Sequence, residues 1–335
     1  MIVYSERYRE HDMRNHPENS LRLKAIMRLL TKEDVFEKVP LVEPSPASRE
    51  DVLRAHLPEH LEAVKRLAED GGSIIDMDTY VTPSSYEIAL LSAGGVLTCV
   101  DKYYEGYEGS YALVRPPGHH AERNKAMGFC LFNNIAIGAT YALERYELKR
   151  ILILDLDVHH GNGTQDIFYS DPRVFYISIH QHPHYPGTGG IEENGEGRGR
   201  GHNLNIPLPA QTCDKSYLKA IDEVVIPMMS SFKPELVLVS AGYDTHHTDP
   251  LGGMNLSQGC YYALTRKLRR STSAGIIFCL EGGYNLNALA KSVYATMAGL
   301  FDLGKSEFEE PLVEDEGVTK YADSRIAILK EKFDL

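Results

Sequence analysis

The sequence lacks tryptophan, and it holds only five cysteines among its 335 residues. The cysteines, at positions 99, 130, 213, 260 and 279, are odd in number and contain no Cys-x-x-Cys pair. The first residues are too polar for a secretion signal, and no apolar run is long enough to span a bilayer. We therefore expect a reduced, cytoplasmic chain with neither a disulfide framework nor a membrane-spanning segment.

Basic residues are also in short supply. The chain carries 35 Lys and Arg against 47 Asp and Glu, which gives a formal net charge of -12. An acidic protein is unsuited to the phosphate backbone of nucleic acid and favours cationic ligands. Hydrophobic residues make up 43% of the chain, enough for a large core, and no repeat or low-complexity linker divides it. We interpret residues 1–335 as a single domain.

Short apolar runs alternate with amphipathic stretches along the chain. The runs are typical of buried parallel strands and cover residues 111–114, 151–158, 174–179, 235–240 and 275–280. One helix is predicted to begin with Thr82 as N-cap and Pro83 at its first position. Another is predicted to begin at Ser48 and to be broken by Pro58. This alternation predicts an α/β fold with a mostly parallel central sheet flanked by helices. The tail after Pro311 is polar and predicts no element.

Each predicted strand runs into a polar cluster. The clusters are RPPGHH, DLDVHHGNG, HQHPH, SAGYDTHHTDP and EGGYN. Ligands of open parallel sheets bind beyond the carboxyl ends of the strands, so we expect one site there. Asp157 and His159 stand at the end of one predicted strand and Asp244 follows another, and three such ligands leave a position open on a catalytic metal. The alternative is that these residues only cap strands and form turns, but the whole set favours a metal centre.

The remaining histidines have less definite interpretations. A second metal site is one hypothesis for four of them, although we favour places at the mouth of the cleft or on the surface: His182, His184, His246 and His247. Four more have no partner that the sequence identifies: His11, His16, His56 and His60. The acidic stretch 76–80 is interpreted as a solvated turn, with contact to a cationic substrate as the alternative.

A nucleotide-binding motif is rejected. Residues 299–306, GLFDLGKS, match the P-loop pattern, but the preceding segment predicts a helix rather than a strand. The following segment is acidic and is interrupted by Pro311. We therefore expect Lys305 to lie at a helix end or in a surface loop.

Six motifs occur together in one order: RPPGHHA, GFCLFNN, DLDVHHGNGTQ, HYPGTG, SAGYD followed by DPLGG, and LEGGYN. They resemble the histone deacetylase superfamily, in the class II-like branch that includes acetylpolyamine amidohydrolases. The resemblance spans residues 115–285, with a weaker match in HPENSLRL near the N-terminus. It implies a single arginase/deacetylase-like domain and a zinc-dependent amidohydrolase that removes acetyl groups from acetylated lysine or a related amine. It also implies Zn2+, with Fe2+ as an alternative native metal, and structural K+ or Na+.

The resemblance assigns roles to the matching residues. The zinc ligands would be Asp157, His159 and Asp244. The catalytic group would comprise His119, His120, Tyr284, Asp155 and Asn162. In this group, His120 would transfer protons, His119 supported by Asp155 would tune the local charge, and the Tyr284 hydroxyl would stabilise the oxyanion. Asn162 stands where other relatives carry an aspartate, which weakens a full His-Asp dyad at His120.

Further residues would line the substrate tunnel and hold monovalent cations. The tunnel residues would be Gly128, Phe129 and Tyr185. The first cation site would use oxygens of Asp155, Asp157, His159, Ser178 and Ile179, and the second those of Phe168, Asp171 and Val174.

Three rivals remain beside a lysine deacetylase. An acetylpolyamine deacetylase would differ around the metal motif and after the third ligand, so DLDVHHGNG and DPLGG favour the general branch. An arginase-type ureohydrolase needs a two-metal cluster with more ligands. A non-catalytic acyl-lysine binder would be expected to have lost Tyr284, a ligand or one of the tandem histidines, and all are present.

Overall fold

The structure is a computed structural model that describes residues 1–304 and 307–335. Lys305 and Ser306, which end the P-loop-like stretch, lie outside the described residues. The earlier part of that stretch belongs to the last turn of helix α10 (Leu286–Phe301), as the sequence predicted. A P-loop would have to begin after a strand instead.

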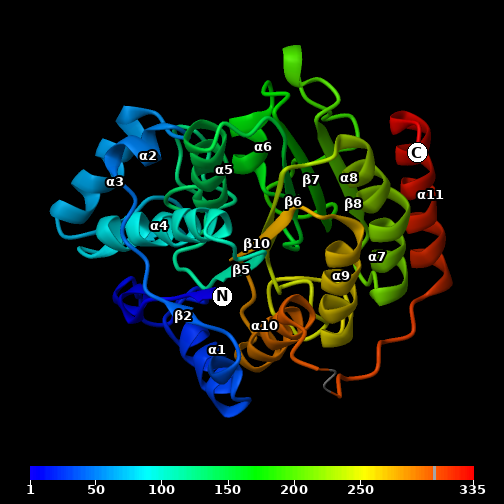
Figure 1. Ribbon diagram of the computed structural model, residues 1–335, viewed down its shortest axis with the longest axis horizontal. Helices are drawn as coiled ribbons and strands as arrows, with labels where there is room; N and C mark the ends of the chain where they lie inside the picture. The colour runs from blue at the N-terminus through cyan, green and yellow to red at the C-terminus, as the bar shows by residue number, and fades with distance from the viewer. Residues whose placement is uncertain (305–306) are drawn as a thin grey trace.

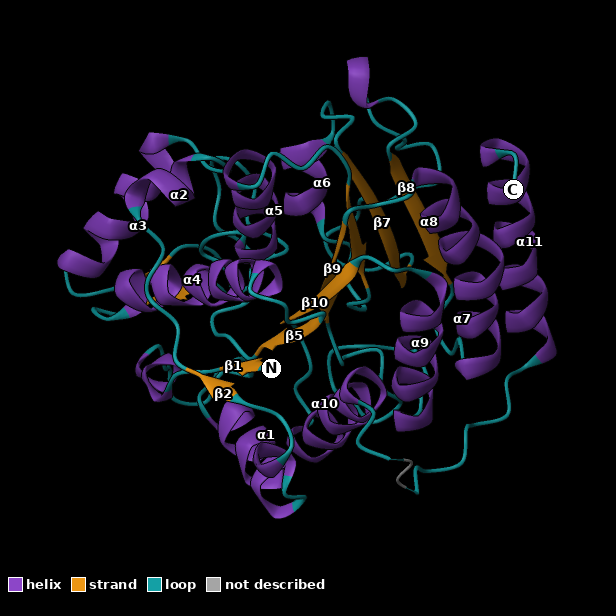
Figure 2. Cartoon of the chain, in the orientation of Figure 1, coloured by secondary structure: helices purple, strands orange, loops and turns teal. Residues whose placement is uncertain are grey.

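Eight strands form one sheet in the described residues, and every neighbouring pair is parallel. In spatial order the strands are β2 (Leu41–Val42), β1 (Ile2–Val3), β5 (Gly109–Ala112), β10 (Gly275–Leu280), β9 (Leu236–Ala241), β6 (Ile151–Asp155), β7 (Val174–Gln181) and β8 (Asn203–Leu208). Figure 2 shows the sheet running obliquely through the molecule between helices. The predicted α/β fold with a parallel sheet is therefore confirmed.

Helices cover both faces of the sheet. On one side lie α4 (Ser85–Tyr104), α5 (Asn134–Arg145) and α6 (Asn162–Phe168), together with the smaller α2 (Arg49–Leu53) and α3 (Pro58–Glu69). On the other lie α1 (Leu21–Lys32), α10, α9 (Gln258–Ser271), α7 (Asp214–Ala220) and α8 (Ile226–Phe232) (Figure 1). Helix α11 (Glu316–Phe333) packs against the edge strand β8 and α7. A short antiparallel hairpin, β3 (Ser73–Ile74) and β4 (Tyr80–Val81), stands apart from the sheet.

The strands follow from continuous apolar sequence. β6, β9 and β10 are buried at every position, which is why they carry no alternation of polar and apolar residues. The prediction at 111–114 was shifted, since β5 ends at Ala112. Strand β8 was missed because Asn203 and Asn205 interrupt its apolar run; both are buried and donate to Gln165 Oε1, at 2.8 and 2.9 Å.

The helix starts were only partly predicted. Ser48 and Asp51 form a reciprocal capping box at α2, and Pro58 takes the first position of α3, so the predicted break is confirmed. The prediction of Thr82 as an N-cap was wrong. Helix α4 begins at Ser85, and the Thr82 hydroxyl lies 2.9 Å from Ser85 Oγ before the helix starts. The tail after Pro311 contains α11, whose weakly amphipathic sequence gave no clear periodicity.

The core is continuous across both faces of the sheet. All five cysteines are buried and unpaired. No helix in the described part of the chain has the length and apolar character needed to cross a membrane.

Candidate metal centre and active site

The polar residues that follow the strands meet at one edge of the sheet. Asp155 is the last residue of β6, and Asp157 and His159 come just after it. Asp244 follows β9, the tandem histidines follow β5, and Tyr284 follows β10. Since β5, β10, β9 and β6 are consecutive neighbours in the sheet, their carboxyl ends deliver these side chains to one place.

Asp157, His159 and Asp244 form a compact ligand set. His159 Nδ1 lies 3.0 Å from Asp157 Oδ1 and 3.4 Å from Asp244 Oδ2. One donor atom from each residue lies within 4.8 Å of the others. Both carboxylates are buried, and Asp244 Oδ2 has no hydrogen-bond partner. An orphaned buried carboxylate oxygen is costly unless a cation meets it, so these residues fit a bound divalent metal.

The backbone around this set makes room for the carboxylates. A Cβ on Gly282 would lie 2.1 Å from Asp244 Oδ2 and 2.6 Å from Asp157 Oδ2, so only glycine fits there. Its N–H instead donates to Asp157 Oδ2 at 2.9 Å. Burial, with the negative charge of Asp157, raises the pKa of Asp244 to about 7. This crowding of like charge is what a metal ion would relieve.

His119 is placed beside negative charge. Its Nδ1 lies 3.1 Å from Asp155 Oδ2, and that oxygen also accepts from the Tyr176 hydroxyl at 3.1 Å. Burial disfavours the imidazolium, but the charges of Asp155 and Asp157 outweigh it and raise the pKa of His119 to about 10. His119 thus favours the protonated form in this arrangement.

His120 has the opposite electrostatics, although its ring centroid is only 4.0 Å from that of His119. Burial, followed by the charges of His119 and His159, lowers the pKa of His120 well below its usual value. Its Nδ1 lies 2.7 Å from Asn162 Oδ1, and the Asn162 amide nitrogen donates to Glu122 Oε1 at 2.8 Å. That second bond fixes the amide orientation, so His120 Nδ1 is the donor and Nε2 keeps a free lone pair.

A cavity of about 500 Å³ leads to these groups. Its lining includes His119, His120, Gly128, Phe129, His159, His184, Tyr185 and Tyr284. Gly128 has φ +56°, and a Cβ there would lie 2.4 Å from the His120 ring. Phe129 also has positive φ, and its N–H donates to Thr79 Oγ1 at 3.1 Å. This turn brings the Phe129 ring edge-on to Tyr284, with centroids 5.6 Å apart.

Tyr284 is held by groups that the sequence did not reveal. Its backbone N–H donates to Asp249 Oδ2 at 2.6 Å, and the Arg22 guanidinium lies 5.0 Å from the centroid of its ring. Arg22 Nε also donates to the Gly283 carbonyl at 2.7 Å. Burial raises the pKa of Tyr284 well above its ordinary value, so the hydroxyl remains a proton donor.

Glu281 is another residue that the analysis of motifs missed. It is fully buried, and one carboxylate oxygen accepts from the N–H groups of Gly118 and His119, at 2.7 and 3.2 Å. The other accepts from the Ser240 hydroxyl at 3.1 Å. Burial raises the pKa of Glu281 to about 7. Its place at the end of β10, within LEGGYN, was the available signal, because that strand end already supplied Tyr284.

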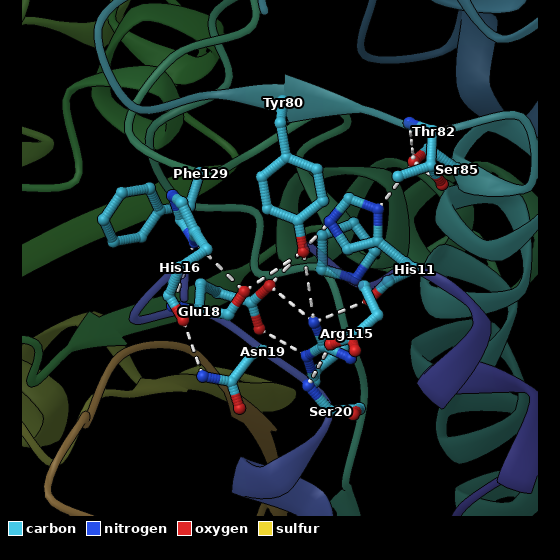
Figure 3. Close-up of polar contacts among 12 residues, drawn as sticks. His11, His16, Glu18, Asn19, Ser20, Tyr80, Thr82, Ser85, Arg115 and Phe129 are labelled. Atoms are coloured by element: carbon cyan, nitrogen blue, oxygen red, sulfur yellow. Dashed lines mark hydrogen bonds and ion pairs between the residues drawn. The ribbon is translucent and has the colours of Figure 1, made fainter. Parts of the chain in front are cut away.

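A buried ion-pair network supports the cavity wall (Figure 3). Both nitrogens Nε and Nη2 of Arg115 donate to the Glu18 carboxylate, which also accepts from Arg22 at 3.0 Å. The Tyr80 hydroxyl donates to the Glu18 carbonyl at 3.1 Å, which ties the β3–β4 hairpin to this network. His16, two residues before Glu18, packs edge-on against Phe129, with ring centroids 4.8 Å apart.

The structure gives partners to the four histidines that lacked one. His11 Nδ1 lies 2.7 Å from Ser85 Oγ, and His60 Nε2 lies 2.8 Å from the Leu131 carbonyl. His56 Nδ1 donates to the Glu122 carbonyl at 2.9 Å, while its Nε2 accepts from Asn133 N at 2.8 Å. His16 Nε2 lies 2.8 Å from the Asp78 carbonyl oxygen, and His16 lines the cavity. These partners are 66 to 77 residues away for His11, His56 and His60, so no local pattern could show them.

The other uncertain groups are also placed. His184 lines the cavity and stacks on His159, while His246 and His247 lie with Glu309 in a separate cluster. The interpretation of residues 76–80 as a solvated turn holds for Met77 and Asp78, which are exposed and also border the cavity, whereas Thr79 and Tyr80 are buried. Asp76 does form a turn, accepting from Asp78 N at 3.1 Å.

The two predicted monovalent-cation sites remain predictions. Asp155 and Ser178 are paired across β6 and β7, and Ser178 Oγ lies 2.8 Å from His180 Nδ1. In the second set, Asp171 N donates to the Phe168 carbonyl at 3.0 Å and Val174 N to the Asp171 carbonyl at 3.3 Å. In the described part of the chain, no buried side-chain oxygen of either set lacks a hydrogen-bond partner.

Together, the parallel sheet, the Asp-His-Asp cluster and the tandem histidines define an α/β protein of the deacetylase type. A family model described as "Histone deacetylase domain" matches residues 16–300. The chain is 40% identical over 332 residues to "Histone deacetylase 10, chloroplastic" of Oryza sativa, covering 90% of this chain and 75% of that protein. It is 41% identical over 322 residues to a "Probable deacetylase" of Archaeoglobus fulgidus, covering 92% and 88%.

A solved structure agrees with these relatives. The crystal structure of the HDA15 HD domain superposes with a TM-score of 0.91 at 34% identity, covering 99% of this chain and 96% of that one. The protein belongs to the histone deacetylase family, and this membership supports a deacetylase function.

Proposed function

We propose that this protein is a zinc-dependent deacetylase that hydrolyses the amide of acetylated lysine or a related acetylated amine. One observation carries the proposal above the others. The Asp157, His159 and Asp244 set, with two buried carboxylates and an orphaned Asp244 oxygen, lies beside His120 at the end of a cavity. Such a set suits a metal with an open position, and the histidine suits proton transfer.

Zinc is the metal that we propose for this ligand set. When bound, the ion would act as a Lewis acid that polarises the amide carbonyl and makes a coordinated water more acidic. One imidazole and two carboxylates also suit Fe2+, so Fe2+ is the alternative native metal. Three ligands support a one-metal amidohydrolase better than a ureohydrolase, which needs a second metal and more ligands.

His120 would handle the protons of the reaction. Its neutral form, with Nδ1 donating to Asn162, presents the Nε2 lone pair as a base for the attacking water. The same Nε2 would then deliver that proton to the leaving amine nitrogen. Asn162 orients the ring without adding a negative charge, in keeping with the expected absence of a His-Asp dyad.

His119 and Tyr284 would stabilise the negative charge that develops on the substrate. His119, whose Nδ1 lies 3.1 Å from Asp155 Oδ2, would contribute positive charge next to His120. The Tyr284 hydroxyl is protonated, and Tyr284 lines the cavity from the end of β10, the strand next to β5, where the hydroxyl would donate to the oxyanion. Gly128, Phe129 and Tyr185 would enclose the acyl chain and exclude water.

The substrate class is tested by product analysis. Purified protein loaded with Zn2+ is incubated with an acetyl-lysine peptide, an acetylpolyamine and free arginine, and acetate, free amine and urea are measured. We expect acetate and free amine in equal amounts from the peptide. Faster acetate release from the acetylpolyamine would select that branch, urea from arginine would select the ureohydrolase, and binding of the peptide without acetate release would select the non-catalytic binder.

A further inference from the structure

A second cluster of metal-ligand residues lies in the same loop as Asp244, beyond the cavity. The loop between β9 and α9 carries Asp244 and Asp249, and between them come His246 and His247. Glu309 approaches from the segment that joins α10 to α11, which Figure 1 shows passing below α9. His246, His247 and Glu309 do not line the cavity.

The donor atoms of the cluster converge. His246 Nε2 lies 2.8 Å and His247 Nδ1 3.6 Å from the same Glu309 oxygen. The two imidazole rings stack with centroids 4.4 Å apart. The set has one donor atom from each residue within 4.8 Å of the others, the same criterion that Asp157, His159 and Asp244 meet. In a tetrahedral site with bonds of about 2.1 Å, ligand atoms lie about 3.4 Å apart, and the two separations from Glu309, 2.8 and 3.6 Å, fall on either side of that value.

The surroundings hold the cluster in place. His246 is 2% exposed, and its backbone is bridged to Leu256, whose carbonyl lies 3.3 Å from His247 Nδ1. The Thr248 N–H and hydroxyl lie 3.2 and 3.0 Å from His246 Nδ1, so Nδ1 accepts from the N–H while Nε2 bonds to Glu309. A metal at Nε2 would place the ring proton on Nδ1, which would then donate a hydrogen bond to the Thr248 hydroxyl in place of the N–H contact. The buried Gln258 side-chain amide lies 3.2 Å from His246 Nε2. Turned about its last bond, that amide presents an oxygen as a fourth ligand.

We propose that His246, His247 and Glu309 bind a second divalent transition metal of the zinc type, with the Gln258 amide oxygen or water completing the coordination. Two imidazoles and a carboxylate favour Zn2+ or Co2+ over Mg2+, which prefers oxygen ligands. The ion would replace the long His247 contact to the Leu256 carbonyl and the direct His246–Glu309 hydrogen bond.

Such an ion would link two segments that are far apart in sequence. One is the loop that supplies Asp244 to the candidate catalytic centre and Asp249 to the backbone of Tyr284. The other is the segment before α11, which Glu314 also anchors, since its carboxylate accepts from Cys213 N at 2.6 Å. A ligand that binds only the folded chain stabilises it, so metal at this cluster raises the unfolding temperature.

The test counts metal equivalents in full-length protein. After chelation and dialysis, Zn2+ is titrated in competition with a chromophoric chelator, and Co2+ spectra report the ligand field. We expect two equivalents for the wild type and for His182→Ala, a matched control whose half-buried ring lies outside the cluster. His247→Ala and Glu309→Gln should each lose one equivalent, and Mg2+ should not compete.

The isosteric Asp244→Asn variant separates this proposal from the proposed function. This variant should lose the metal equivalent of the candidate catalytic centre and keep the equivalent bound by His246, His247 and Glu309. Zn2+ should still raise its unfolding temperature, and adding Glu309→Gln should abolish that increase. Suppose that the wild type binds only one equivalent, and that Glu309→Gln loses it while Asp244→Asn keeps it. That result would support the metal site at this cluster and contradict the proposed catalytic zinc. If His247→Ala and Glu309→Gln both bind as many equivalents as wild type, the cluster holds no metal and Glu309 serves only as a hydrogen-bonding anchor.

Discussion

Replacing Tyr284 with phenylalanine removes a single hydroxyl from the candidate active site. The aromatic ring can stay where it is, because Phe129 contacts its edge, Arg22 lies over its face, and Asp249 holds its backbone N–H. None of these contacts uses the hydroxyl. The substitution is therefore a clean test of whether that hydroxyl stabilises the transition state.

The expected loss follows from the removal of one oxyanion donor. One such donor contributes about 10²–10³ in kcat, or about 2.7–4 kcal/mol. KM and metal content should change little, since the ring, the cavity wall and the ligand set remain. Initial rates on an acetyl-lysine peptide, with metal analysis of the same samples, give these quantities. A trifluoroacetyl substrate should recover part of the rate, because its carbonyl is already electron-poor.

Tyr185→Phe is the matched control. It removes a hydroxyl from the same cavity, on a ring that packs edge-on against His120 at 5.1 Å between centroids. We expect a far smaller loss than for Tyr284→Phe. A Tyr284→Phe enzyme with the wild-type kcat would refute the oxyanion role and leave the tyrosine as a packing residue.

Three further predictions concern the histidines and the Tyr284 anchor. His120→Ala should lower kcat more than His119→Ala, with metal retained in both; small and equal losses would return the tandem pair to an ordinary turn. Asp249→Asn should lower kcat by less than Tyr284→Phe does, because the amide oxygen can still accept from Tyr284 N. Asp249→Ala removes this acceptor and should lower kcat nearly as much as Tyr284→Phe. Wild-type kinetics in both variants would contradict the anchoring role of Asp249. His56 is buried, and its burial, together with the nearby His60, lowers its pKa to about 3. Below about pH 6.5, His56 is therefore protonated in the unfolded chain but stays neutral in the folded chain. As pH drops from 6.5 toward 3, this residue should lower the free energy of unfolding by about 1.4 kcal/mol per pH unit. Urea unfolding at pH 7 and pH 5 should show a smaller loss of stability in His56→Gln than in wild type. An equal loss in both proteins would contradict the assignment.

Apolar strands were the part of the fold that sequence predicted best. β6, β9 and β10 are continuous apolar runs, and a buried parallel strand needs no other signal. β8 was hidden because its two asparagines are satisfied by Gln165, a partner that only the folded chain brings near. The predicted start of helix α4 was wrong because Thr82 and Ser85 both carry hydroxyl groups suited to a helix N-terminus, and the Thr82 hydroxyl bonds to that of Ser85.

The site divides in the same way. Asp157, His159 and the tandem histidines stand in local motifs at strand ends, so their convergence was predictable from the parallel topology. The Glu18–Arg115 pair joins residues 97 positions apart, and Glu281 reaches the backbone of Gly118 from 163 positions away. These groups orient the local motifs, but their partners are set by tertiary packing, which no spacing in the sequence records.

The proportion between bound metal and acetate release tests the central claim most directly. Metal-free protein is reloaded with increasing Zn2+, Co2+ or Fe2+, and acetate released from an acetyl-lysine peptide is measured against the equivalents bound, in wild type and in His159→Ala. Using the Glu309→Gln background restricts the count to the Asp157, His159 and Asp244 set. We expect no acetate without metal, a rate that rises with occupancy to one equivalent, and no rescue of His159→Ala. Full turnover by verified metal-free protein, or no acetate at full occupancy, would contradict the assignment of a metal-dependent deacetylase.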